Sequence, residues 1–255
     1  MGGWPTSRSF AVEIELDLSV CIVAGCKTQG LRGLLDTVYA TADPLAFEVI
    51  VAEVGESGAA LLTDDFPGLL VARLSGRSRL AAANHAMSMG QGRYTTLIDD
   101  DVRVQPDCLR RLVEFMDDNP EVGLASPRIL DAYGKTEPSC HDFPRLLKPC
   151  GLPLPATRGR QLLETAEGDW CRSGFHLLRR ELIEDIGLLD ANCPRLAELD
   201  LYWRARRQGW HNYYLFEAVA VHANPGRYHA ELTARPAWPE RIKENLSFLK
   251  RRWLG

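Results

Sequence analysis

The sequence predicts an α/β protein built on a mostly parallel sheet flanked by helices. Apolar runs of strand length alternate with amphipathic stretches of helix length through the first hundred residues, and this alternation favours parallel strands joined by crossover helices. The fourth of these strands runs into three consecutive carboxylates, Asp99, Asp100 and Asp101. Open sheets of this kind bind their ligands at the carboxyl ends of the strands. The sequence therefore predicts a ligand site at that acidic edge.

The elements of the first half have clear boundaries. Residues 18–24 form an almost continuous apolar run, which is typical of a strand buried on both faces. Apolar residues then recur at helical spacing through residues 31–39, up to an Asp-Pro break. We expect further strands at residues 47–52 and 69–74, a helix of small residues at 79–89, and the strand that begins at Tyr94.

The second half is less regular. Residues 131–168 hold many of the Pro and Gly residues and show no sustained period, so we expect a long loop there, and such loops are usually functional or mobile. Before this loop we expect a helix at residues 107–118 and a strand at 122–126. After it we expect a strand at 174–178, helices at 180–186 and 196–208, strands at 213–216 and 218–222, and a basic amphipathic helix at 239–254.

The whole-chain composition is that of an ordinary globular protein. The chain has 255 residues, of which 45% are hydrophobic and 25% charged, which is enough apolar material for one large domain or two small ones. A net charge of −4 gives no indication of nucleic-acid binding. No apolar run approaches the ~18 residues of a membrane span, and we expect no signal peptide. Seven cysteines without a Cys-x-x-Cys pair favour a reducing, cytoplasmic setting over a disulfide framework or a zinc site.

The acidic triplet carries a chemical signal of its own. Three adjacent carboxylates repel one another, and a divalent cation with oxygen ligands is the usual way to offset such repulsion in proteins. The triplet by itself leaves a second interpretation open, which is a solvated loop with acidic side chains.

Seven segments, in order, resemble the family 2 glycosyltransferases, and in particular their bacterial rhamnosyltransferase-like branch. Each segment is a weak signal, but together they span most of the chain, from residue 18 to residue 222. They are the strand and polar turn at 19–27, the acidic residue Glu53 after the second strand, the Ala-rich helix with Asn84, the Gly-x-Tyr strand with the acidic triplet at 92–106, residues 126–134, residues 174–190, and residues 198–209.

The resemblance implies the GT-A fold, which is a Rossmann-like, mostly parallel sheet flanked by helices, with a smaller acceptor-side subregion. The domains expected from it are a leader at residues 1–17, a nucleotide-sugar-binding half at 18–130, an acceptor-binding half at 131–235, and a C-terminal basic amphipathic helix at 236–255. That helix could bring the protein to the anionic inner face of the cell membrane. Packing on the catalytic domain with its basic face in water is the alternative.

The resemblance also implies a reaction. The family transfers a sugar from a nucleotide-diphosphate donor, here a UDP- or dTDP-sugar, to an acceptor hydroxyl with inversion, and Mg²⁺ or Mn²⁺ is the expected cofactor. Asp101 and Asp99 would hold the metal, with His222 as a further ligand, and Glu198 would be the general base. The alternative for Glu198 is a helix N-terminal acid stabilised by the helix dipole. The alternative for His222 is a hydrogen-bonded structural histidine.

Other residues are expected to bind the donor or the acceptor. Glu53 could equally be a solvated turn acid, and Trp170 a core aromatic. Asp200 should point about 200° away from Glu198 on its helix, so it fits an organising role better than a chemical one. The full expected set is Glu53, Arg79, Asn84, Asp99 and Asp100 for the donor nucleotide, and Trp170, Gly174 and Asp200 for the acceptor.

Three positions depart from the family pattern. Cys26 stands where Asn is usual, Glu53 stands where an Asp-Asn pair is usual, and residues 197–200 read Ala-Glu-Leu-Asp where Glu-Asp-x-Asp is usual. These departures keep open a catalytically degenerate nucleotide-sugar-binding protein of the same fold.

A nucleotidyltransferase is the other alternative, although residues 25–27 make a poor phosphate-binding loop. An oxidoreductase is disfavoured because no Gly-x-Gly-x-x-Gly follows the first strand. The leading expectation is an enzyme of polysaccharide or glycoconjugate synthesis in the cytoplasm, acting on a carbohydrate, lipid-linked or other hydroxyl acceptor.

Overall fold

The structure is a computed structural model that describes residues 15–25, 28–143, 159–171 and 174–223. Most of the expected leader at residues 1–17 lies outside these ranges, as do Cys26 in the first turn and the whole C-terminal helix expected at 236–255. The bounds of the four expected domains stay predictions.

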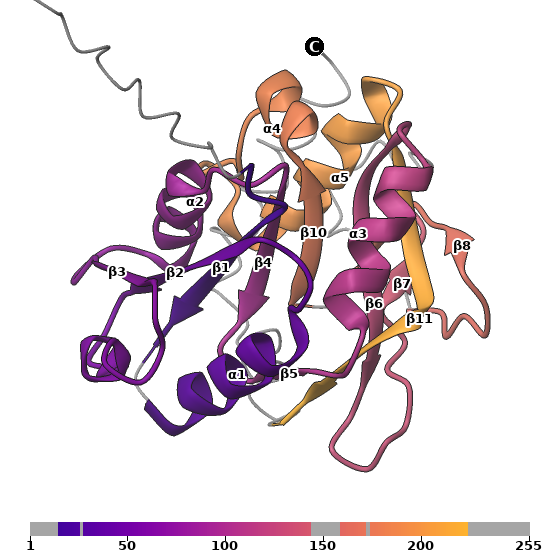
Figure 1. Ribbon diagram of the computed structural model, residues 1–255. Helices are drawn as coiled ribbons and strands as arrows, with labels where there is room; N and C mark the ends of the chain where they lie inside the picture. The colour runs from indigo at the N-terminus through magenta and orange to yellow at the C-terminus, as the bar shows by residue number, and fades with distance from the viewer. Residues whose placement is uncertain (1–14, 26–27, 144–158, 172–173, 224–255) are drawn as a thin grey trace, which may run out of the picture.

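A mixed sheet forms the centre of the described part of the chain (Figure 1). Its strands are β1 (Leu18–Ala24), β2 (Phe47–Glu53), β3 (Leu69–Arg73), β4 (Tyr94–Asp99), β5 (Val102–Val104), β6 (Val122–Leu130), β8 (Ala166–Glu167), β10 (Phe175–Arg179) and β11 (His211–His222). They follow one another in space in the order β3-β2-β1-β4-β10-β6-β11-β5, and β8 pairs with β11. Two short strands, β7 (Cys140–His141) and β9 (Trp170–Cys171), form a separate sheet.

The first four strands confirm the expected parallel sheet. β1 pairs in parallel with β2 and with β4, and β2 pairs in parallel with β3. β10 lies between β4 and β6 and is antiparallel to both (Figure 1). Beyond it, β6 and β11 are parallel again, while β5 and β8 run antiparallel to β11. The result is the mostly parallel α/β class that the sequence predicted.

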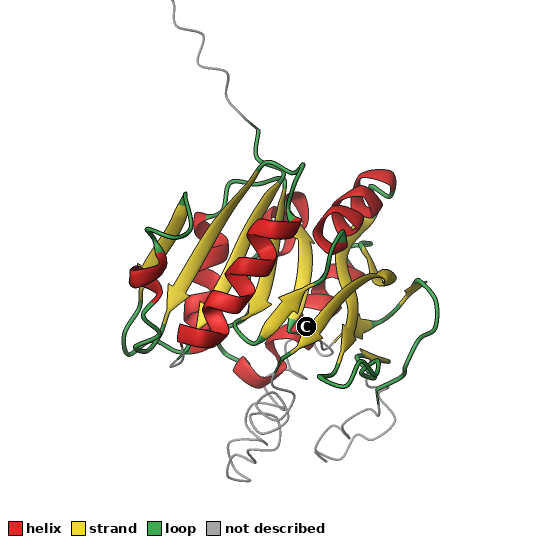
Figure 2. Cartoon of the chain, turned by 60° about the horizontal axis from the view of Figure 1, so that its bottom comes forward, coloured by secondary structure: helices red, strands yellow, loops and turns green. Residues whose placement is uncertain are grey.

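Helices cover both faces of this sheet (Figure 2). Val20 and Ile22 of β1 belong to the apolar cluster that contains residues of α1 and α3, whereas Cys21 and Val23 belong to the cluster that contains residues of α2, α4 and α5. Successive side chains of a strand point to opposite faces, so a strand covered on both sides is mostly apolar, and in β1 the one polar side chain, Ser19, donates a hydrogen bond to Glu48. The helices are α1 (Thr28–Thr41), α2 (Arg79–Met89), α3 (Cys108–Asp118), α4 (Arg180–Ile186) and α5 (Ala197–Arg207), with 3₁₀ turns at Ala59–Leu62 and Pro194–Leu196.

Two expected elements differ from those in the structure. The strands expected at residues 213–216 and 218–222 are one twelve-residue strand, β11. Its register against β6 shifts between Leu215 and Val219, and such a bulge breaks the alternating pattern that identifies a strand. β6 runs on to Leu130, past Pro127, because at that point β6 pairs with β11 and its pairing with β10 has ended.

The loop expected over residues 131–168 is also partly structured. The strands β7 and β8 lie within it, and each has two residues, which is too short to leave a periodic signal. Within the described ranges, we find no helix with the length and apolar character needed to cross a membrane.

Candidate active site

The acidic triplet lies where β4 ends and the chain turns into β5. We call Asp99, Asp100 and Asp101 the acidic edge. Asp100 and Asp101 are buried, whereas the side chain of Asp99 is 33% exposed. Asp100 accepts a hydrogen bond from the backbone N–H of Gly25 over 3.0 Å. The turns that follow the neighbouring strands β1 and β4 are therefore tied together at one edge of the sheet.

Asp99 lies in a strongly negative environment. Burial raises the pKa of Asp99 to about 6, the charge of Arg79 opposes the shift, and the charges of Asp101, Glu198 and Asp100 add to it. Arg79, in the first turn of α2, donates to Asp99 Oδ1 over 2.9 Å. The pKa stays above its usual range despite this contact, because burial outweighs the opposing charge of Arg79. A divalent cation would relieve the remaining repulsion.

Gly174, which directly precedes β10, lies against Asp99 of the acidic edge. Its carbonyl oxygen accepts a hydrogen bond from the backbone N–H of Asp99 over 2.9 Å. Its φ of 61° lies in the left-handed region, and a Cβ at this position would lie 2.8 Å from Asp99 Oδ2. Both observations require glycine. Gly174 thus acts through its backbone, by allowing the chain to approach the acidic edge.

His222 reaches this region from the end of β11, where it lies opposite Val102 of β5. Its Nδ1 lies 2.9 Å from Glu137 Oε2, and the side chain is buried. Burial lowers the pKa of His222, but the hydrogen bond to Glu137 and the charges of Glu137, Asp101 and Asp99 outweigh that effect and raise it. A carboxylate on one ring nitrogen is the usual support of a metal-ligating histidine. Sequence reasoning missed Glu137, which lies in the irregular region after β6 and belongs to no motif.

Glu198 comes from the first turn of α5, where the helix dipole favours an acid. Its side chain is 34% exposed, and its Oε1 lies 3.6 Å from Nε2 of His176. The charge of Glu198 raises the pKa of Asp99. The fold therefore brings the candidate base and the candidate metal ligands to one site, although Asp99 and Glu198 lie far apart in the sequence.

A buried polar cluster stands behind Glu198, and sequence reasoning did not identify it. Nδ1 of His176 lies 3.0 Å from Ser126 Oγ and 3.0 Å from the Tyr202 hydroxyl, and these two oxygens are 2.7 Å apart. All three side chains are buried. We call Ser126, His176 and Tyr202 the hydroxyl–imidazole cluster. They come from β6, β10 and α5, so no local pattern could have joined them. Strand alternation does predict that His176 points to the other face of the sheet from Phe175 and Leu177.

Two residues expected at the donor nucleotide have hydrogen-bond partners within the protein. Oε1 of Glu53 accepts hydrogen bonds from the N–H and hydroxyl of Ser57 and from the N–H of Ala59. Burial raises the pKa of Glu53, but these hydrogen bonds lower it by more, so the carboxylate stays ionised and holds the turn after β2. Asn84 donates to the Leu189 carbonyl over 2.8 Å and accepts from the Leu189 N–H over 3.0 Å. Its amide thus clamps α2 to the loop before α5.

Two residues expected at the acceptor also have structural partners. Asp200 is fully buried, and Arg204 donates to its Oδ2 over 2.8 Å. Arg204 also donates to the carbonyl oxygens of Ile186 and Leu188, so the pair holds the loop after α4 against α5. The Trp170 ring stacks on His141 with 4.6 Å between centroids, within the small β7–β9 sheet.

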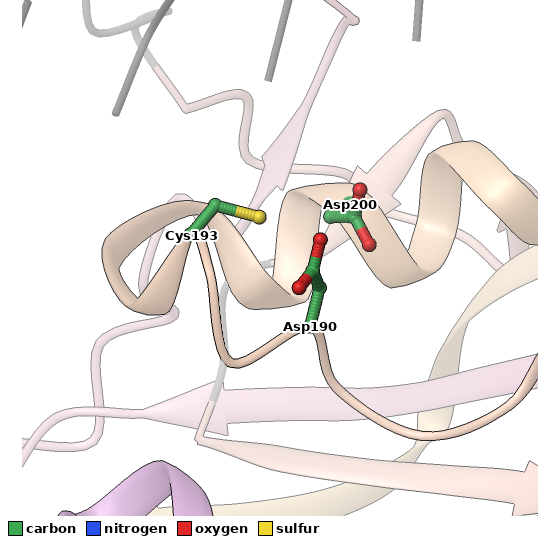
Figure 3. A group of neighbouring side chains, drawn as sticks. All are labelled: Asp190, Cys193 and Asp200. Atoms are coloured by element: carbon green, nitrogen blue, oxygen red, sulfur yellow. The ribbon is translucent and has the colours of Figure 1, made fainter. Parts of the chain in front are cut away.

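Asp190, Cys193 and Asp200 form a second group of potential metal ligands (Figure 3). One ligand atom from each lies within 4.8 Å of the others, and the three side chains point toward one another. Asp190 Oδ1 accepts from the backbone and side chain of Asn192, and Asp200 pairs with Arg204. These contacts place the group within the packing of the loop on α5.

Comparison with known proteins identifies the family. Residues 19–187 match the family model described as glycosyl transferase family 2. A mannosyltransferase, PcManGT from Pyrobaculum calidifontis, solved with GDP-Man and Mn²⁺, is 16% identical over 92% of this chain and 69% of its own, with a TM-score of 0.59. GalNAc-T7, solved with UDP, GalNAc and Mn²⁺, is 14% identical over 92% of this chain, with a TM-score of 0.66. The chain spans about half (48%) of that second protein.

No curated protein matches the chain in sequence. At these low identities the two solved structures show a shared fold, which confirms the expected GT-A architecture. The rhamnosyltransferase-like branch stays a prediction. Since the family model covers well over half of the residues, the chain belongs to glycosyl transferase family 2 and is a glycosyltransferase.

Proposed function

We propose that this protein transfers a sugar from a UDP- or dTDP-linked donor to an acceptor hydroxyl, with inversion and with Mn²⁺ or Mg²⁺ as cofactor. The observation that carries the proposal is a convergence of charge. The charges of Asp101 and Glu198 help to raise the pKa of Asp99, and the charges of Asp99 and Asp101 help to raise the pKa of His222. Three separate parts of the chain, namely β4 with the turn after it, α5 and β11, supply these groups at one edge of the sheet, where α/β folds bind their ligands.

The acidic edge fits a divalent metal. Carboxylate oxygens and an imidazole suit Mn²⁺, and carboxylates suit Mg²⁺. Asp101, Asp99 and His222 would hold the ion, with Glu137 orienting His222. When bound, the ion would stabilise the negative charge on the departing nucleotide diphosphate as a Lewis acid. Both related solved structures contain Mn²⁺, which supports this assignment.

Glu198 is the proposed general base. Its carboxylate would take the proton of the acceptor hydroxyl as that oxygen forms its bond to the anomeric carbon. A third of the side chain is exposed, so an acceptor can approach it from solvent. Direct displacement by the acceptor needs one base and no covalent sugar–enzyme intermediate, and it inverts the anomeric configuration.

Other residues would serve the donor directly or indirectly. Arg79 carries a positive charge beside Asp99 and would also pair with the donor diphosphate. Asp100 holds the turn after β1 through Gly25. Glu53 and Asn84 would act indirectly. Glu53 holds the turn after β2, and Asn84 holds the loop before α5.

The acceptor is proposed to be a carbohydrate, lipid-linked or other hydroxyl compound in polysaccharide or glycoconjugate synthesis. Membrane contact through residues 236–255 stays a prediction, because that segment lies outside the described residues.

Isothermal titration tests the donor site. UDP, dTDP and GDP are titrated with and without Mn²⁺ into the wild type and into Asp101→Ala, with the exposed Asp64→Ala as the matched control. We expect UDP or dTDP to bind only with Mn²⁺, and we expect the binding to be lost in Asp101→Ala and kept in Asp64→Ala. If none of the three nucleotides binds, the donor-site assignment is wrong.

A second measurement separates an enzyme from a degenerate binding protein. The matching UDP- or dTDP-sugar is incubated with Mn²⁺ and a panel of acceptors, and the product anomer is read by NMR. Release of nucleotide with an inverted product supports the proposal. Tight metal-dependent binding with neither transfer nor hydrolysis would favour the degenerate alternative.

A further inference from the structure

We propose that His176 is a positioning residue for Glu198. In this arrangement a neutral imidazole points its Nε2–H at the Glu198 carboxylate, and Ser126 and Tyr202 hold the opposite ring nitrogen. The inference rests on the proposed role of Glu198 as the base, and it adds the contact that orients the Glu198 carboxylate.

The position of Nε2 is the first observation. His176 is 2% exposed, and Nε2 is a buried atom with no hydrogen-bond partner in the described part of the structure. Glu198 Oε1 lies 3.6 Å away, which is just beyond hydrogen-bonding distance. Because Glu198 is partly exposed at the start of α5, a small side-chain rotation closes this gap. Catalytic hydrogen bonds are often long before substrate binds and tighten in the complex.

The contacts on the other side of the ring are compatible with this tautomer of His176. Two hydroxyl groups, Ser126 and Tyr202, surround Nδ1 and also contact each other. Burial raises the pKa of Tyr202 well above its usual value, so its hydroxyl keeps its proton. One hydroxyl can then donate to Nδ1 while the second donates to the first.

The reverse tautomer is electrostatically unfavourable. It would put the proton on Nδ1 and present the lone pair of Nε2 to a carboxylate. The Glu198 carboxylate therefore favours the tautomer that carries its proton on Nε2. Two thiols, Cys140 and Cys171, also lie near this cluster. Their mutual contact together with burial raises the pKa of Cys171 well above the usual value, whereas the contact lowers the pKa of Cys140.

The consequence for the reaction is orientation. A glutamate in the first turn of a helix has several rotamers, and a donor from the buried side selects one of them. The same hydrogen bond favours the ionised carboxylate, which is the form that accepts a proton. Misplacing a reacting group by about 1 Å can cost on the order of 100-fold in rate.

Steady-state kinetics of His176→Leu and His176→Gln test the proposal. We expect His176→Leu to lower kcat about 10- to 100-fold with the metal-dependent nucleotide Kd unchanged. His176→Gln should recover part of the loss, since its amide nitrogen can donate from near the position of Nε2. The acidic limb of the kcat/KM pH profile should move to higher pH in His176→Leu, because Glu198 loses the donor that stabilises its ionised form. Wild-type kcat in His176→Leu would overturn the proposal.

His211→Gln is the matched control, since His211 also pairs with a glutamate, Glu167, but lies at the opposite end of β11 from His222. Tyr202→Phe keeps the packing and removes one hydroxyl of the cluster, so it tests the same contact should His176→Leu fold poorly. We expect a smaller fall in kcat for Tyr202→Phe and none for His211→Gln.

A double-mutant cycle shows whether His176 acts through Glu198. With Glu198→Gln already present, His176→Leu should cause no further loss of kcat. Independent, multiplicative losses would mean that His176 acts elsewhere and would overturn the proposal.

A measurement without turnover separates this inference from the proposed function. The ¹⁵N shifts of the His176 ring at pH 7 should show a neutral Nε2–H tautomer, and Glu198→Gln should shift the Nε2 resonance. An Nδ1–H tautomer would overturn the positioning contact even in an active enzyme. If Glu198→Gln keeps wild-type kcat, the base assignment fails, while the expected ¹⁵N result would still establish the contact.

Discussion

The two sides of the candidate site differ in how they manage charge. At the acidic edge, Asp99, Asp100 and Asp101 crowd together, and the pKa of Asp99 rises to about 6 although Arg79 donates to it. The side built from β10 and α5 instead buries the hydroxyl–imidazole cluster and pairs its fully buried carboxylate, Asp200, with an arginine. One side gathers negative charge that a cation would offset, and the other pairs its buried carboxylate with an arginine of the same helix.

This difference teaches where the effect of a substitution should appear. Removing a charge from the acidic edge should weaken metal and nucleotide binding while costing the fold little. Removing a group from the β10–α5 side should reduce the stability of the fold, because a buried partner is left behind. The three predictions below test that separation.

Asp200→Ala should have the largest effect on stability. It leaves Arg204 beside the loop after α4 without its buried carboxylate, and breaking a buried pair costs about 3–5 kcal/mol. Urea unfolding measures the change. The exposed Glu184→Ala on α4 is the control and should stay within about 0.5 kcal/mol of the wild type. An equally small change in Asp200→Ala would remove the basis of the comparison.

Glu137→Ala should act on the metal. His222 loses the carboxylate that orients its ring, and loss of such a partner typically lowers metal affinity about 10- to 100-fold. Mn²⁺ titration measures this effect, with Glu137→Gln expected between the wild type and Glu137→Ala. The exposed Glu121→Ala should bind Mn²⁺ as the wild type does. A Glu137→Ala protein that unfolds more easily yet keeps its metal affinity would contradict the separation of roles.

Asp99→Asn should stabilise the metal-free protein slightly. Because the pKa of Asp99 in the folded protein, about 6, lies above its usual value of about 4, the folded state holds this proton to higher pH than the unfolded chain does. Stability is therefore lost as pH rises from about 4 to about 6. Asparagine removes this loss, which we place at about 1 kcal/mol at pH 7, since a third of the side chain reaches solvent and is screened.

Urea unfolding with a chelator at pH 4, 5, 6 and 7 measures the effect of Asp99→Asn. The difference from the wild type should vanish at pH 4 and grow toward pH 7, while the Mn²⁺ affinity of the variant falls. An Asp99→Asn variant that is less stable than the wild type at pH 7 would show that the Asp99 carboxylate stabilises the folded protein instead of destabilising it.

Sequence patterns predicted the parallel half of the fold closely. The expected strand at residues 18–24 and the expected helix at 79–89 have the observed bounds. These segments are buried on defined faces and end at turn residues, so their periodicity is a local property. The pattern was weaker for β11, where the bulge after Leu215 made one strand look like two.

The sequence by itself determined the α/β class, the glycosyltransferase family and the position of the acidic triplet at the end of a strand, since each of these follows from local patterns and from their order along the chain. Only the tertiary structure decided that Asn84 and Asp200 hold neighbouring segments, and that His176 and Glu137 stand behind Glu198 and His222. Such contacts join residues on different elements, up to 105 positions apart for Asn84 and Leu189. They depend on which strands are neighbours in the sheet, and local periodicity carries no information about strand order.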